Sequence, residues 1–459
     1  MKTFSSKNLS LYSSQATVSL LRGWQIRWQA LTLSEKVVCA NIVLIPLWWI
    51  AGLYRYWALL LCFGILCHDY LRYRKLQLRR PNFMVACLLL FCTYQCIGLF
   101  LFSLSTSLVN VTTLIRTSIF WFPPAFILWY AKSNNIKVRF EVIAWACSVL
   151  AFEMFVFWLA AQAIFKGNSY DPPRTIFSLL VGNASGSYAS GKGLENYLIP
   201  YAIKEKDVSI IFGLPRWNFF FVTPETGAIV SAFLSLVALD ISQRRWSISL
   251  LFISLFFVLM GGTRSIWLGL PLVIIMRCSI TLGKNKKLFI PLAVLAFISF
   301  SFLAVPTITA PLAKVYSEAF DSVSSYRGTS TDVRGEIYLR TLEAIPNRLF
   351  WGHWVRGESV LAGSELARVG SHSFILSSLL YRLGLVGTSL FLLFWLALVV
   401  ELFRTLSVRP LFAPCVITLY CLLSIPMEFG VMPSTMIVLL STLVYQPNSK
   451  TFPSRVHYA

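Results

Sequence analysis

The chain has 459 residues, of which 57% are hydrophobic and only 13% charged, and its mean hydropathy is +0.69. Soluble domains carry roughly a quarter charged residues, so this composition excludes an ordinary soluble protein and predicts an integral membrane protein. The net charge of +21 does not indicate a nucleic-acid partner, because the basic residues cluster in short gaps between apolar runs, as in the cytoplasmic loops of membrane proteins.

Apolar runs of the length that crosses a bilayer, about 20 residues, recur along the whole chain. They predict an all-α polytopic membrane protein with about twelve transmembrane helices. The expected helices lie near residues 37–54, 56–70, 83–103, 113–131, 142–165, 224–241, 246–263, 265–281, 288–306, 384–402, 411–427 and 430–446.

Positive charge predicts the orientation of these helices. The gap between the second and third helices, residues 71–82, is strongly basic and contains no acid. The later even-numbered gaps are basic too, with Lys132, Lys137, Arg139, Arg244, Arg245, Arg277, Lys284, Lys286, Lys287, Arg404 and Arg409. With twelve helices all these gaps lie on the cytoplasmic side, and both termini are expected there as well.

Two long loops are expected on the opposite side of the membrane. Residues 166–223 hold six basic and four acidic side chains, and residues 307–372 hold seven of each, so neither loop has the basic bias of the cytoplasmic gaps. The second loop contains the amphipathic stretch RGEIYLRTLEAIPNRLFWGHW from Arg334 onwards. That stretch predicts a loop that is partly helical.

No metal ion or other cofactor is expected. All ten cysteines fall in or beside apolar runs, which argues against a disulfide framework and a thiolate metal site. The sequence also lacks HExxH, CxxC and paired-carboxylate spacings beside the apolar segments.

Arginines stand out at the expected outer ends of three helices. Arg264 lies between two apolar runs with almost no loop around it, Arg216 precedes the helix near 224–241, and Arg116 begins the helix near 113–131. An arginine at such a depth is costly unless it is paired or faces water, and its guanidinium group matches phosphate oxygens. The alternative is an interfacial arginine that reaches the headgroups, and Arg116 fits this alternative best.

His372 is one of four histidines and directly precedes the return of the chain to the membrane. A histidine can accept a proton near neutral pH, although one at a membrane mouth is more often a structural polar residue. Arg334 heads the amphipathic stretch; Glu336 and Arg340 form an i,i+4 pair there and are expected to be structural.

The order TRSIWLGL, RGEIYLRTLEAIPNRLFWGHW and GSHSFILSSLLYRLGLVG resembles the bacterial O-antigen ligase and polymerase family over residues 214–400. The matching positions are Arg264, Arg334, Pro346, Gly352, His372, Ser373, Gly384 and Gly387. Two features depart from the family pattern. Ten residues separate Ser373 from Gly384, one more than is usual, and Glu225 or Thr226 replaces a common asparagine after Arg216.

The resemblance implies a glycosyltransferase of the bacterial inner membrane that uses an undecaprenyl-diphosphate-linked glycan at the periplasmic face. It implies His372 as general base, Arg334 and Arg264 as catalytic residues, and Arg216, Arg116 and Ser373 as substrate-binding residues. The acceptor would be a lipid or a second glycan. A core with a periplasmic catalytic loop at 307–372 is then expected over residues 214–402, between an N-terminal part, 1–213, and a C-terminal part, 403–459.

Two other function classes fit the composition. A transporter or flippase of lipid-linked sugars would use the arginines to bind the headgroup without chemistry. A scaffold of an envelope-assembly complex would leave His372 without a role.

Overall fold

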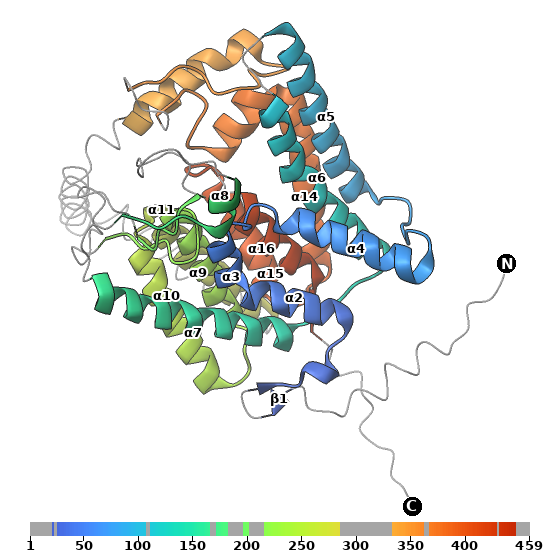
Figure 1. Ribbon diagram of the computed structural model, residues 1–459, viewed down its shortest axis with the longest axis vertical. Coiled ribbons are helices and arrows are strands. Elements are labelled where there is room, and N and C mark those ends of the chain that lie inside the picture. Colours follow the sequence, from blue (N-terminus) through green and yellow to red (C-terminus); the bar gives the residue numbers. More distant parts are fainter. Residues whose placement is uncertain are drawn as a thin grey trace, which may run out of the picture.

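The computed structural model of the chain describes residues 21–22, 25–106, 111–165, 171–181, 196–201, 215–284, 333–361, 367–428 and 431–446. These residues form a helical bundle (Figure 1). Its α-helices are α2 (Leu33–Val43), α3 (Ile45–Ala51), α4 (Trp57–Tyr73), α5 (Phe83–Ser105), α6 (Val111–Ser133), α7 (Phe140–Phe165), α8 (Ile176–Val181), α9 (Pro224–Ala238), α10 (Arg244–Gly261), α11 (Arg264–Lys284), a helix over 333–344, α14 (Arg382–Arg404), α15 (Phe412–Leu423) and α16 (Val431–Leu443).

Other elements are short. The 3-10 helices η2 (Trp28–Ala30) and η4 (Ile345–Arg348) and the π-helix η5 (Phe374–Tyr381) complete the helical part. Strands β1 (Leu21–Arg22) and β2 (Gln25–Ile26) form an antiparallel pair, and β3 (Val138–Arg139) pairs in parallel with β4 (Val444–Tyr445). The helical architecture confirms the all-α prediction.

Every expected apolar segment within the described residues coincides with helix; the segment 288–306 lies outside them. In the described part, five stretches are long and apolar enough to cross a membrane: α5, α7, α10, Arg264–Thr281 of α11, and η5 continued by α14. The pair α2–α3, bent by 58°, would make a sixth. The structure therefore agrees with a polytopic membrane protein, and the number twelve stays a prediction.

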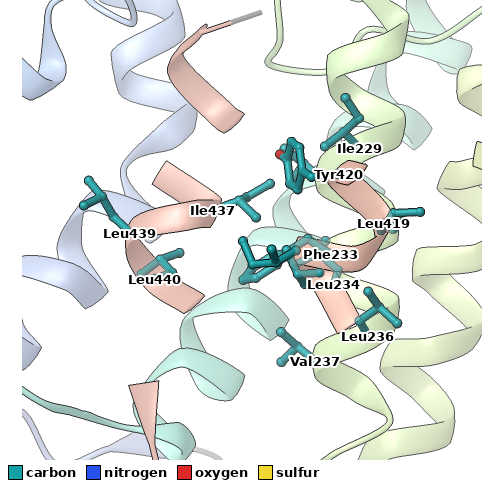
Figure 2. Close-up of a cluster of buried hydrophobic side chains, with 14 of the residues drawn as sticks. Ile229, Phe233, Leu234, Leu236, Val237, Leu419, Tyr420, Ile437, Leu439 and Leu440 are labelled. Atoms are coloured by element: carbon teal, nitrogen blue, oxygen red, sulfur yellow. The ribbon is translucent and has the colours of Figure 1, made fainter. Parts of the chain in front are cut away.

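Helix α9 forms the centre of the bundle. Its residues from Thr226 to Ala238 are all buried, which is typical of a helix that other helices surround. Figure 2 shows its apolar side chains packed against those of α15 and α16, with Ile229, Phe233, Leu234, Leu236, Val237, Leu419, Tyr420, Ile437, Leu439 and Leu440 labelled. Helices α9 and α15 are apolar but shorter than a full membrane span.

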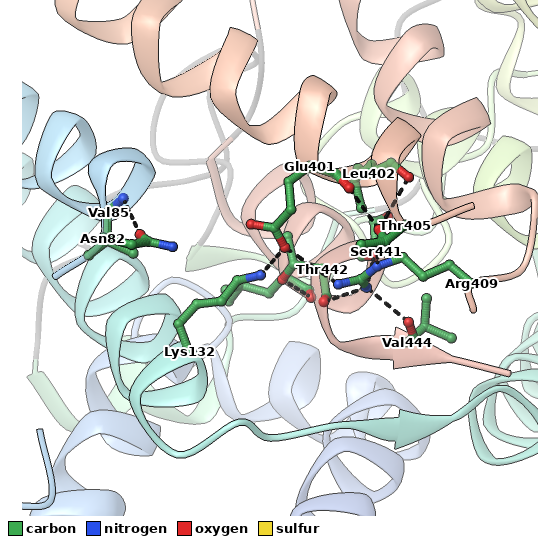
Figure 3. A network of polar contacts seen from close by, with 11 residues as sticks. Asn82, Val85, Lys132, Glu401, Leu402, Thr405, Arg409, Ser441, Thr442 and Val444 are labelled. Atoms are coloured by element: carbon green, nitrogen blue, oxygen red, sulfur yellow. Dashed lines mark hydrogen bonds and ion pairs between the residues drawn. The ribbon is translucent and has the colours of Figure 1, made fainter. Parts of the chain in front are cut away.

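Some of the basic residues at the expected cytoplasmic side have structural roles. Glu401 of α14 forms ion pairs with Lys132 of α6 and with Arg409, the latter at 3.5 Å (Figure 3). The Arg409 guanidinium also donates to the carbonyls of Thr442 and Val444, at 2.6 and 2.9 Å. Cations stabilise the unpaired carbonyls at a helix C-terminus, so this network joins the ends of α6, α14 and α16.

Candidate functional site

Three of the expected site residues come together. Arg216 precedes α9, Arg264 is the first residue of α11, and Arg334 lies in the first turn of the helix over 333–344. Arg264 interacts electrostatically with both Arg334 and Arg216. We call these three residues the arginine cluster. The structure thus brings together side chains that lie up to about 118 positions apart in the chain.

Arg216 organises the base of the arginine cluster. It is 7% exposed, and its Nη2 donates to Glu225 Oε1 at 2.9 Å and to Thr263 Oγ1 at 3.4 Å. Its Nε donates to the Gly261 carbonyl at 3.2 Å. These bonds hold the start of α9 against the turn between α10 and α11, which is the turn that presents Arg264.

The arginine cluster carries an excess of positive charge. Glu225 neutralises Arg216 and interacts electrostatically with Arg334. In the described part of the chain, no carboxylate forms an ion pair with Arg264 or Arg334. Arg264 also lies at the N-terminus of a 21-residue helix, where the helix dipole disfavours a cation and favours an anion. This arrangement fits the binding of an anion such as a diphosphate.

His372 lies in an unusual backbone conformation. Its φ is +68°, in the left-handed region that costs a residue other than glycine about 1 kcal/mol or more. The neighbouring Ser371 and Ser373 are each 2% exposed, whereas His372 is half-buried. The turn therefore holds His372 nearer to the surface than its two neighbours.

Tyr338 connects this turn to the helix that carries Arg334. Its hydroxyl lies 3.3 Å from the carbonyl oxygens of His372 and Pro426 and donates to them. Burial raises the pKa of Tyr338, an effect that the nearby Arg334 charge opposes. Tyr338 was not anticipated as a site residue; the only sequence signal is that it is an aromatic residue on the same amphipathic stretch as Arg334.

Ser373 is engaged in local structure. Its hydroxyl accepts the Leu376 N–H at 3.1 Å and caps η5. The N–H of Phe374 donates to the carbonyls of Ser424 and Met427 at 3.1 and 2.9 Å. The cap fixes the start of the π-helix directly after His372, and the proposed contact of Ser373 with substrate stays a prediction.

A second charged group lies one turn further along η5. Glu428 accepts from Arg356 Nη2 at 2.8 Å and from the Ser378 hydroxyl at 3.1 Å, and it pairs with Arg382. Burial by itself would raise the pKa of Glu428, but the charges of Arg382 and Arg356 outweigh it and lower this pKa to about 2. The ionised carboxylate therefore fastens η5 and the segment around Arg356 to the end of α15.

Arg116 is exposed on α6. Within the described residues, no hydrogen bond or ion pair joins it to the arginine cluster. Its role in substrate binding stays a prediction, and its exposure also fits an interfacial arginine.

An apolar cavity of about 190 Å³ lies beside the turn of His372. Phe374 and Ile375 of η5 line it, together with Trp121 of α6 and with Phe391 and Trp395 of α14. A hydrocarbon chain fits such a lining. The turn of His372 thus contacts the helix that carries Arg334, through Tyr338, and adjoins an apolar cavity.

Potential metal ligands do not gather in the described part of the chain, where no three His, Cys, Asp or Glu side chains are close enough to hold an ion. The expectation that the transfer reaction needs no metal ion concerns the reaction itself, and it stays a prediction.

Comparison with known proteins gives one positive finding. Residues 249–392 match the profile of a protein family described as O-antigen ligase. The match includes Arg264, Arg334 and His372. No curated protein matches the chain.

Proposed function

We propose that the chain, whose residues 249–392 match the O-antigen ligase family, transfers a glycan from an undecaprenyl-diphosphate donor at the periplasmic face of a bacterial inner membrane. The observation that carries the proposal is the convergence of the arginine cluster with the helix that positions His372. The acceptor is a lipid or a second lipid-linked glycan.

The arginine cluster binds the diphosphate in this proposal. Arg264 and Arg334 contact the phosphate oxygens, because guanidinium groups match them in a two-pronged geometry. Arg216 holds the α10–α11 turn through Glu225 and Gly261 and adds charge from below. As the bond between the anomeric carbon and the phosphate oxygen breaks, the departing diphosphate gains negative charge that these groups stabilise.

His372 acts as the general base. It accepts the proton of the acceptor hydroxyl while the oxygen attacks the anomeric carbon, and the glycan leaves the diphosphate for the acceptor. The strained turn and the Tyr338 bond to the His372 carbonyl hold the residue at one position. The apolar cavity beside Phe374 supports a substrate with a hydrocarbon chain.

A transfer assay tests this function against lipid transport. Purified protein in nanodiscs is mixed with a polyprenyl-diphosphate-linked oligosaccharide and, in parallel samples, with a lipid A–core acceptor or a second lipid-linked oligosaccharide. A transferase forms a covalent product and releases polyprenyl diphosphate, both visible by mass spectrometry. In proteoliposomes, movement of the donor between leaflets with no new covalent product would contradict the proposal and favour a flippase.

A further inference from the structure

Residues 348–354 pack against the C-terminal half of α5. The Arg348 guanidinium lies 5.9 Å from the centre of the Phe102 ring, and the Trp354 ring fills the space beside Gly98. The Tyr94 hydroxyl donates to the carbonyl of Leu383 at 2.9 Å and lies 3.4 Å from the carbonyl oxygen of Trp351. Positions 94, 98 and 102 lie on one face of the helix, so the segment follows α5 over about 12 Å of its length.

This contact places the segment at membrane depth. Helix α5 is among the helices apolar and long enough to cross a membrane, and Tyr94 lies about 16 Å along the axis from its end at Ser105. The segment also pairs with residues 381–386, which belong to the apolar span Phe374–Arg404. In Figure 1 the orange helix over 333–344 lies at the top of the view, near the upper end of α5.

Backbone hydrogen bonds tie the segment to residues 381–386, which suits a segment at membrane depth, where backbone groups need partners inside the protein. Gly384 breaks the helix with a φ of +64° and a ψ of −170°. Groups freed by this break bond to the segment: Leu385 N donates to Leu349 O at 2.9 Å and Val386 N to Phe350 O at 3.2 Å. In return, His353 N and Trp354 N donate to the carbonyls of Tyr381 and Arg382, at 2.9 and 2.8 Å.

The outer face of the segment is strongly apolar. Phe350 and Trp351 are 61% and 64% exposed. Leu339 and Leu342, three positions apart on the preceding helix, are also exposed, as are Leu101 and Leu104 of α5. A patch of this kind beside a membrane-spanning helix continues the lipid-facing surface of that helix.

We propose that residues 348–354, together with Leu339 and Leu342, form a membrane insert whose apolar face lies in the hydrocarbon of the leaflet next to the arginine cluster. Lipid is the occupant, because the segment packs on α5, a helix apolar and long enough to cross a membrane, whose own Leu101 and Leu104 are exposed. The exposed Arg340 and Arg348 flank the patch and suit the headgroup region. The assignment of the insert to the outer leaflet rests on the proposed function. The insertion of residues 348–354 into the membrane does not.

The insert has a consequence for the site. It fixes the helix over 333–344 at the membrane boundary, so Arg334 is held at the level where a lipid-linked diphosphate lies. This coupling explains why a polar loop that carries a site residue contains the apolar sequence Leu349–Phe350–Trp351.

A depth measurement tests the insert without any catalytic readout, so failure of the proposed transfer activity and failure of the insert are distinguishable. Phe350 is replaced by p-acetylphenylalanine and coupled to a ketoxime spin label in otherwise native protein, in nanodiscs of phosphatidylethanolamine and phosphatidylglycerol. The matched control carries the same label at the exposed Glu358. We expect collisions with oxygen to dominate at position 350 and collisions with a water-soluble nickel complex to dominate at position 358.

Two results would overturn the proposal. One is access of the nickel complex to position 350 equal to that at position 358, which would place the patch in water. The other result comes from comparing nanodiscs that hold one copy of the chain with nanodiscs that hold two. Dipolar broadening between labels at position 350 only in the discs with two copies would make the patch an interface between copies of this chain.

Discussion

Gly352 and Gly384 pack backbone against backbone. A Cβ atom on Gly352 would lie 2.4 Å from the Arg382 carbonyl oxygen and 2.5 Å from the Gly384 nitrogen. One on Gly384 would lie 2.3 Å from the Phe350 carbonyl oxygen and 2.6 Å from the Gly352 nitrogen. Both residues have a positive φ. This contact joins the end of the loop that carries Arg334 to the helix that follows His372.

Gly384→Ala should destabilise the protein and reduce transfer. Alanine at φ +64° and ψ −170°, a region that is essentially restricted to glycine, costs about 1–3 kcal/mol, and forcing a methyl group into a filled space costs about 1–3 kcal/mol more. Thermal unfolding of detergent-purified protein measures the effect. Gly335→Ala is the control, because a Cβ atom there meets nothing within 4 Å; equal melting temperatures for the two variants would contradict the close contact.

Tyr338→Phe should lower kcat and leave KM nearly unchanged. The variant keeps the ring but loses the one hydroxyl proton that is shared between the carbonyls of His372 and Pro426, a bond worth about 0.5–1.5 kcal/mol. If the loss raises the activation free energy by the same amount, kcat falls about tenfold. Tyr70→Phe, at an exposed position on α4, is the control. A rise in KM alone would show that Tyr338 contacts substrate and does not position His372.

His372→Asn should abolish transfer while the protein stays folded. Asparagine tolerates the left-handed backbone better than alanine does, so the variant removes the base and retains the turn. Loss of a general base costs about 10²–10⁴ in rate. The measurement is product formation at matched protein amounts, beside His372→Ala. Product formation by the asparagine variant at the wild-type rate would exclude His372 as the base.

Arg264→Lys and Arg334→Lys should each reduce the transfer rate by about 10²–10³, the typical cost of losing one preorganised donor. Lysine keeps the charge and loses the two-pronged geometry. Arg340→Lys is the control, because Arg340 is exposed and pairs with Glu336 at 2.6 Å. Equal activity of all three variants would show that charge alone, without guanidinium geometry, is needed at the site.

Chelation of divalent cations should leave transfer unchanged, because the arginine cluster is proposed to stabilise the leaving diphosphate. Purified protein is assayed with excess EDTA and again after addition of magnesium or manganese. Activity that disappears with chelator and returns with either metal would contradict the proposal. The acids Asp332, Glu336 and Glu343 would then be the first candidates for metal ligands, of which Asp332 lies outside the described residues.

The sequence by itself determined the helical membrane class and pointed to several candidate site residues. Hydrocarbon thickness sets the length of an apolar run, so runs such as those of α5 and α7 are readable without coordinates. Arg264, Arg334 and His372 were recognisable because ionisable side chains are rare beside apolar segments, where they are costly and usually functional. Gly352 and Gly384 were recognisable as positions of the family motif, but the sequence did not show their physical role.

Only the tertiary structure decided which of these residues meet. Glu225 pairs with Arg216 across nine positions, Tyr338 bonds to His372 across 34, and Gly352 packs on Gly384 across 32. No local periodicity encodes such contacts, because they depend on how separate helices pack. The break at Gly384 is the clearest case: the sequence predicts a helix that begins near residue 384, and the backbone of residues 349–354 makes the break stable by bonding to groups that it exposes.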